Sequence, residues 1–306
     1  MLVAPTVDNT YGMLYAAVVV SAVLYGVGIV QFWMYIRRYH AKDPLVVKSV
    51  VIIVLVCDIM QQGLLTYAVY QYLVTSMRTP AILQSLERSF LVELFFSCAI
   101  ATLVQQFYCW RIYKITVENR FRFPLAGAVS ILGFTTSALS YVFLIKAVKF
   151  SLLTDFVELR KLAIITNSFT AVTDITISVA LIIVLHTVKT GYKKTTDMVN
   201  RLMVFTFNTG LPTSICAVLV IICVTAFSET FLYMFFFLLL GRLYTNSILV
   251  TLNCREYIKS SQNNFGQDLE LSLNISVTSP IPASEVLVPS QFERSTMHDS
   301  DLKNSH

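Results

Sequence analysis

The chain has 306 residues, of which 56% are hydrophobic and only 13% are charged. An ordinary soluble domain carries about a quarter charged residues, so this composition excludes a chain whose whole surface faces water. The net charge of +5 could indicate nucleic-acid binding, but the basic residues form short clusters between apolar runs, which is typical of loops beside a bilayer. The sequence therefore predicts an all-α, polytopic integral membrane protein without a nucleic-acid partner.

Seven apolar runs follow one another along the chain, and each has the length of about 20 residues that a helix needs to cross a hydrocarbon core. They predict a seven-helix transmembrane bundle within residues 1–254. In the sixth run, Gly210 and Pro212 predict a bend, because proline removes a backbone donor and clashes with the preceding turn. The predicted spans are residues 12–33, 45–74, 90–110, 123–145, 162–185, 202–227 and 230–252.

Lys and Arg residues set the expected orientation, because cytosolic loops carry an excess of them. Thirteen lie in the loops after the first, third and fifth spans and just past the seventh, whereas six lie in the other loops. This difference places the N-terminus outside and the C-terminus in the cytosol, as expected for a multi-pass protein of the plasma membrane. Residues 255–306 are rich in Ser, Asn and acidic residues, which predicts a disordered cytosolic tail.

Three charged residues lie near the middle of predicted spans, namely Asp58, Asp174 and Arg242. A charge at the bilayer centre costs about 2.5 to 3.5 kcal/mol on insertion scales, so such residues usually face the bundle interior. We expect Arg242 to pair with one of the two aspartates. The pair either belongs to a ligand or ion pocket, in which Arg242 could change partners, or is a buried salt bridge that fixes helix register. Glu93, close to the start of the third span, is expected to be a solvated residue at the outer rim.

Uncharged polar residues extend this candidate network. Asn208 and Asn246 lie in the sixth and seventh spans, and side-chain amides inside a bundle often bond across helices, for about 0.6 kcal/mol on average. Cys254 lies at the cytosolic end of the last span beside Arg255. This position makes it a candidate for lipidation, with an inert thiol as the alternative.

Several activities are disfavoured by residues that their chemistry would need. A retinal Schiff base needs a lysine in the last span, which contains Arg242 and no lysine. The four histidines lie outside the predicted spans and form no pair with zinc-binding spacing. The chain has no GxSxG elbow and no phosphate-binding glycine loop. We therefore expect no enzymatic activity, no metal and no cofactor.

Long sequence motifs resemble those of a known family. TDITISVALIIVLHTVKTGYKKTTDMVNRLMVFTFNTGLPTSICA at 173–217 and RLYTNSILVTLNCR at 242–255 resemble seven-span membrane proteins of mushroom-forming basidiomycete fungi, whose C-terminal half is a domain of unknown function. LYGVGIVQFWMY at 24–35 and FYCWRIYKIT at 107–116 fit the same pattern. The resemblance implies seven spans but no ligand or activity, and Cys254 stands where alanine or serine is more usual. The characteristic positions match Asp174, Arg201, Asn208, Thr209, Gly210, Tyr244, Asn246, Ser247 and Asn253.

Three functions are compatible with these observations. We favour a receptor-like protein that senses a small or lipophilic ligand and signals to a cytosolic partner through its loops and tail. The alternatives are a transporter or channel that uses Asp58, Asp174 and Arg242, and a structural membrane protein without a ligand. An odd number of spans without an evident repeat argues against the usual transporter plans.

Overall fold

The computed structural model describes residues 6–39, 43–79, 83, 85–116, 122–149, 156–187, 193–227 and 230–254; the side chains of residues 122, 156–158, 187 and 193–209 lie outside this description. The chain divides into two units, residues 1–262 and 263–306. The second unit and the predicted tail, residues 255–306, lie outside the described residues.

Seven long helices make up most of the described chain, and each predicted span falls on one of them. Six are long and apolar enough to cross a membrane, and in α6 the described apolar part is Gly210–Ala226. A short 3-10 helix, η1 (Thr75–Met77), follows α2. The long helices are α1 (Tyr11–Tyr39), α2 (Leu45–Leu73), α3 (Arg88–Ile115), α4 (Arg122–Ala147), α5 (Phe156–Thr187), α6 (Lys193–Ala226) and the C-terminal helix (Leu232–Cys254).

The backbone has little alternative to helix inside a bilayer, where no water is present to bond free N–H and C=O groups. The boundary residues follow the same chemistry. Pro44 directly precedes α2, with φ −63° and ψ 150°. Its ring fixes φ near this value, and its nitrogen has no proton that would need an acceptor. At the other end of α2, the Val74 N–H still donates to the Tyr70 carbonyl at 2.8 Å.

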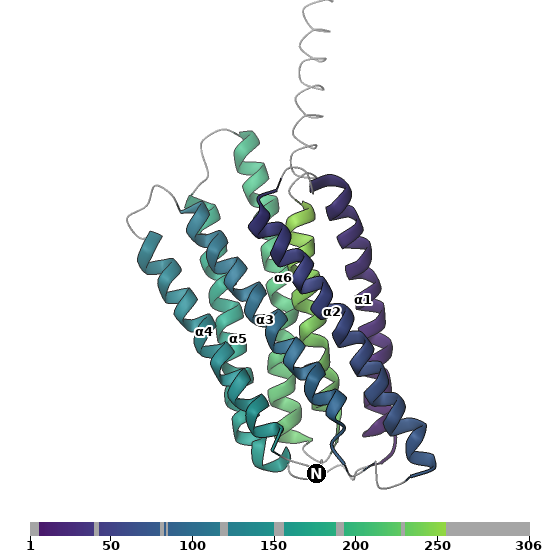
Figure 1. The fold of residues 1–306 in the computed structure, drawn as a ribbon. Helices are drawn as coiled ribbons and strands as arrows, with labels where there is room; N and C mark the ends of the chain where they lie inside the picture. Colours follow the sequence, from purple (N-terminus) through teal and green to yellow (C-terminus); the bar gives the residue numbers. More distant parts are fainter. Residues whose placement is uncertain are drawn as a thin grey trace, which may run out of the picture. The chain divides into compact units, whose positions relative to one another are not determined.

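Consecutive helices run in alternating directions and pack side by side (Figure 1). α3 also packs against α5. The C-terminal helix, yellow-green in Figure 1, lies among the others and makes side-chain hydrogen bonds with α1, α2, α3 and α5. In its most apolar stretch 67% of the residues are buried, against 22% in α1. The last helix is therefore the core around which the other helices assemble.

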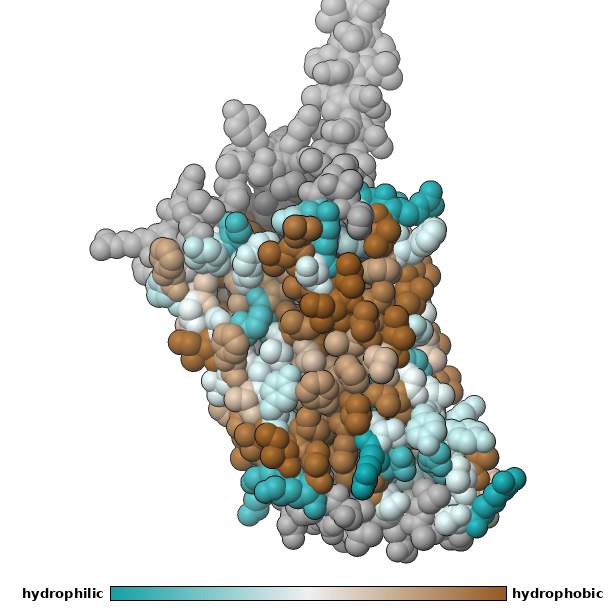
Figure 2. Space-filling view, viewed as in Figure 1, coloured by the Kyte–Doolittle hydropathy of each residue, from teal (hydrophilic) through white to brown (hydrophobic). Residues whose placement is uncertain are grey.

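The bundle has an apolar exterior, and its mid-span charged residues face the interior. Figure 2 shows a broad hydrophobic band between more hydrophilic ends. Branched side chains of α1 and α4 point outward, with Val23 63% exposed and Ile131 69% exposed. The charged side chains of Asp58 and Arg242, in contrast, are 1% and 0% exposed. This arrangement is the one expected when lipid replaces water as the solvent.

A polar layer lies between two apolar clusters. One cluster joins the C-terminal part of α1 to the N-terminal part of α2, including Tyr35 and Val51. The other joins the opposite ends of the same helices, including Leu14 and Leu65. Ser21, Asp58 and Arg242 occupy the intermediate positions on their helices. The apolar clusters thus separate the polar layer from both ends of the bundle.

We predict that Gly241→Ala destabilises the bundle. A Cβ at this position would lie 2.6 Å from Gln61 Nε2 and 2.8 Å from Gln61 Oε1, so the buried amide would have to move. Overpacking of this kind costs about 1 to 3 kcal/mol. The thermal unfolding midpoint of the purified protein should fall accordingly.

The matched control is Gly63→Ala, because a Cβ on this exposed α2 glycine meets nothing within 4 Å. Its midpoint should be unchanged or slightly higher, since alanine restricts the unfolded chain. Equal midpoints for the two variants would contradict the close approach at Gly241.

Candidate functional site

The segment RLYTNSILVTLN of the C-terminal helix directs polar side chains to several neighbours. Arg242 and Tyr244 are two residues apart, so they point about 200° apart around the helix axis. Arg242 bonds to Ser21 of α1 and Asp58 of α2, whereas Tyr244 bonds to Asp174 of α5. Two polar centres therefore flank one helix.

The first centre is the ion pair between Arg242 and Asp58. Arg242 Nη1 donates to both a carboxylate oxygen and the backbone carbonyl of Asp58, the latter at 2.7 Å, and Nε donates to Ser21 Oγ at 2.9 Å. Thr245 Oγ1 donates to the same carboxylate at 3.3 Å, and the guanidinium lies 5.7 Å from the centre of the Tyr25 ring. Of the two aspartates that could pair with Arg242, the structure selects Asp58.

Glu93 extends this centre, and its predicted place at a solvated rim was wrong. The residue is 1% exposed, and its Oε1 accepts a hydrogen bond of 2.7 Å from Gln61 Nε2. The sequence shows that Glu93 is near the start of a span, but not that it faces α2. Its Oε2 has no partner among the described residues, and the same is true of Gln61 Oε1 and Arg242 Nη2.

The second centre is built around Asp174. Tyr244 donates its phenolic proton to Asp174 Oδ2 at 2.7 Å, and Gln105 Nε2 lies 3.4 Å from Oδ1. These side chains border a small pocket of about 20 Å³, together with Thr213 and Gly210 of α6. Within the described part of the chain, Asp174 forms no salt bridge. Hydrogen bonds from neutral groups therefore hold this carboxyl.

Gly210 brings α6 against α5. A Cβ at this position would lie 2.0 Å from Ser178 Oγ and 3.2 Å from Ser178 Cβ, so a larger residue would force the Ser178 side chain to move. α6 continues as a helix past Pro212, and the Gly210 carbonyl accepts bonds from the Thr213 and Ser214 hydroxyls at 2.9 and 3.0 Å. The predicted bend in this helix stays a prediction.

The other predicted site residues are dispersed. Asn246 Nδ2 donates to the Leu24 carbonyl of α1 at 3.0 Å, on the Arg242 side of the helix. Asn208 lies in α6, and its side chain is outside the described residues, as are those of Arg201 and Thr209. Cys254 is a half-buried free thiol at the last residue of the C-terminal helix, and its lipidation stays a prediction.

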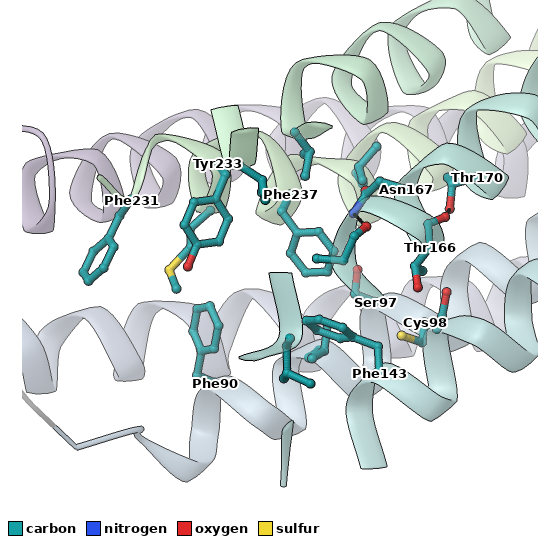
Figure 3. Close-up of a pocket in the computed structure, with 18 of the residues that line it drawn as sticks. Phe90, Ser97, Cys98, Phe143, Thr166, Asn167, Thr170, Phe231, Tyr233 and Phe237 are labelled. Atoms are coloured by element: carbon teal, nitrogen blue, oxygen red, sulfur yellow. Dashed lines mark hydrogen bonds between the residues drawn. The ribbon is translucent and has the colours of Figure 1, made fainter. Parts of the chain in front are cut away.

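A cavity of about 440 Å³ lies on the Tyr244 side of the C-terminal helix. Asp58, Asp174 and Arg242 do not line it, but Tyr244 does. Figure 3 shows around it aromatic side chains of α3, α4 and the C-terminal helix, with Phe231 just before that helix, and polar side chains of α3 and α5 gathered at one part of its wall. The labelled aromatic residues are Phe90, Phe143, Phe231, Tyr233 and Phe237, and the labelled polar residues of α3 and α5 are Ser97, Cys98, Thr166, Asn167 and Thr170.

The cavity was not predicted from the sequence, although a weak signal for it was present. Ser97, Thr166, Asn167 and Thr170 are polar residues in apolar spans. Polarity in a span indicates an interior position, but it does not indicate whether the neighbouring side chains fill the space. Among the residues that the structure describes, no three His, Cys, Asp or Glu side chains are grouped closely enough to hold a metal ion.

Comparison with known protein families gives a match in the C-terminal part of the chain. Residues 170–257 match DUF6534, a family of unknown function. This region covers most of α5, all of α6 and the C-terminal helix, and so includes Asp174, Arg242 and Tyr244. No curated protein and no solved structure is significantly similar to the chain.

We predict that Arg242→Met lowers stability strongly, because it leaves the Asp58 carboxylate buried without its cation. Breaking a buried ion pair in this way costs about 3 to 5 kcal/mol. Arg242→Met combined with Asp58→Asn removes both charges and should recover a large part of this loss. Unfolding of the purified protein by heat or by SDS measures both changes.

Asp174→Asn in the Arg242→Met background is the matched control, since Asp174 bonds to Tyr244 and not to Arg242. It should give no recovery. Recovery with Asp174→Asn, or none with Asp58→Asn, would contradict the pairing described above.

Proposed function

We propose that this chain is a receptor-like membrane protein that binds a small lipophilic molecule in the 440 Å³ cavity. The cavity is the observation that carries the proposal. Its volume lies within the range of about 300 to 1,000 Å³ typical of small-molecule sites, and such sites combine apolar walls with a few polar groups. The aromatic and polar side chains in Figure 3 provide both.

The proposed topology has seven spans, with the N-terminus outside and the C-terminal end of the last helix in the cytosol. Arg37 and Arg38 lie in the last turn of α1 and Lys114 in the last turn of α3, which supports a cytosolic location for these ends. α6 has 34 residues, about 50 Å of helix, and supplies the seventh crossing. We also propose that the protein lies in the plasma membrane and belongs to the fungal seven-span family. The match over residues 170–257 supports the proposed family.

Tyr244 offers a route from the cavity toward the cytosolic side. It lines the cavity and also the small pocket that holds Asp174, Thr213 and Gly210. A ligand that displaces Tyr244 would disturb its bond to Asp174 and the adjoining contact between α5 and α6. The basic segment from Lys189 to Arg201, between these two helices in sequence, is where we propose that a cytosolic partner binds.

Transport through the central charges is the alternative. Arg242 is 0% exposed and paired with Asp58, and Asp174 is 5% exposed beside a pocket of about 20 Å³. Close packing around these groups favours a structural role for them over a permeation path. We propose no enzymatic activity for the protein.

The ligand hypothesis is tested by filling the cavity. Ala163 lines it, so Ala163→Trp should exclude the ligand. Lipophilic molecules extracted from the protein purified in lipid nanodiscs are compared by mass spectrometry. A compound enriched with the wild type should fall at least tenfold with Ala163→Trp.

Ala138→Trp is the matched control, since Ala138 is exposed on α4 and does not line the cavity. It should retain the compound at the wild-type level. Equal retention by both tryptophan variants would overturn the cavity as the ligand site.

The transport alternative predicts uptake that depends on the protein, whereas the receptor-like function predicts none. Vesicles that contain the wild type, Asp58→Asn or Asp174→Asn should take up the extracted compound at the rate of protein-free vesicles. Uptake that depends on the protein and is lost in either variant would establish a transporter and contradict the receptor-like function.

A further inference from the structure

The polar part of the cavity wall contains groups with unused hydrogen-bonding capacity. Ser97 of α3 and Thr166 and Asn167 of α5 line it, and they are 8%, 7% and 3% exposed. Thr166 Oγ1 is buried without a hydrogen-bond partner, and the described residues offer none to Ser97 Oγ either. Asn167 Nδ2 donates to the Ala163 carbonyl at 2.9 Å. Two hydroxyl donors therefore lack an acceptor.

An empty site of this kind is unfavourable, because a buried polar group without a partner costs about 1 to 3 kcal/mol. In Figure 3 the hydroxyl end of Thr166 points from α5 toward the side of the cavity formed by Ser97 and Cys98 of α3. Each of these hydroxyls would be satisfied by an acceptor oxygen in the cavity.

The charges of the wall favour an uncharged ligand. Arg160 is the one cationic residue among the described residues that line the cavity, and none of those residues is Asp or Glu. Arg160 already donates to the Thr225 carbonyl at 2.8 Å. It precedes Asn167 by seven residues on α5, which is about 10 Å along the helix axis. A charge beside Ser97 and Thr166 would therefore lack a counterion, and its desolvation would go uncompensated.

The remaining volume and walls suit a hydrocarbon body. A cavity of about 150 Å³ holds one benzene ring, so a cavity of about 440 Å³ suits roughly 15 to 20 non-hydrogen atoms. Phe90, Phe143, Phe231 and Phe237 surround this space in Figure 3. Aromatic faces pack well against flat or branched hydrocarbon groups.

We propose that the cavity binds an uncharged lipophilic ketone or alcohol, whose oxygen accepts hydrogen bonds from Ser97 and Thr166 and whose hydrocarbon body packs among the four phenylalanines. This inference specifies the ligand class of the proposed function and rests on it. The same two hydroxyls distinguish this ligand class from a hydrocarbon of equal shape.

Benzophenone is a suitable probe, because it is an uncharged ketone of about this size that couples to nearby C–H bonds on irradiation. It is added to the protein in lipid nanodiscs, and labelled peptides are quantified by mass spectrometry. Labelling of cavity-lining residues is normalised to labelling of the lipid-facing residues of α1. The Ser97→Ala and Thr166→Val double variant should lower the normalised labelling about three- to tenfold for each hydrogen bond lost.

Thr176→Val is the matched control, since this α5 hydroxyl bonds to the Val172 carbonyl and lies outside the cavity lining. It should leave the labelling unchanged. Thermal melts of the ligand-free proteins should show the double variant at least as stable as the wild type, because the hydroxyls that it removes have no partner. A variant that melts much lower would contradict the unpaired state of these groups.

Two competitors separate the possible failures. 1,1-Diphenylethylene has the shape of benzophenone without its oxygen and so loses both hydrogen bonds. In competition for labelling of the wild-type cavity, it should be about ten- to hundredfold weaker than benzophenone analogues that keep the ketone. If 1,1-diphenylethylene competed as well as the ketones, and the double variant were labelled as strongly as the wild type, the hydroxyl contact would be overturned. The cavity would then still bind lipophilic molecules. Stronger competition by 4-benzoylbenzoate would overturn the uncharged class, and an absence of labelling in the cavity would contradict the proposed function itself.

Discussion

A bilayer interior offers no water to polar side chains, so each one needs a partner from within the bundle. The C-terminal helix supplies several of these partners. Arg242 binds Asp58 and Ser21, Tyr244 binds Asp174, and Asn253 Nδ2 donates to the Gln31 carbonyl at 2.7 Å. Because these bonds are directional and lie at different depths, they set the axial position of this helix against its neighbours. The polar contacts therefore specify the register of this helix, and the apolar clusters pack around it in that register.

The two faces of this helix use their polar groups differently. On the Arg242 side, Asp58, Gln61 and Glu93 are enclosed, and Gly241 leaves room for the Gln61 amide. On the Tyr244 side, the phenol borders both a small pocket and a cavity large enough for a ligand. The first arrangement suits a rigid contact between helices, since separating the ion pair would leave an unpaired charge in a medium of low dielectric constant. The second leaves space in which side chains can rearrange.

Hydropathy was sufficient to locate the helices, because the length of an apolar run reflects the thickness of the bilayer. It was also sufficient to place Asp58 and Arg242 at mid-span, where charge is rare. It could not choose between Asp58 and Asp174 as the partner of Arg242, because that choice depends on which helix lies beside each face of the C-terminal helix. Glu93 shows the same limit, since its burial follows from contact with Gln61 on a different helix. The cavity depends on the volumes of side chains from several helices.

Tyr244 is therefore the residue through which ligand binding could influence helix packing. Its hydroxyl bonds to Asp174 of α5, and the pocket behind it reaches Thr213 and Gly210 of α6. A ligand shifts such a contact only by the difference between its affinities for the two arrangements. One added hydrogen bond, worth about 1 kcal/mol, changes the ratio of these two affinities roughly fivefold. The hydroxyls of Ser97 and Thr166, which have no partner among the described residues, can supply a difference of this size.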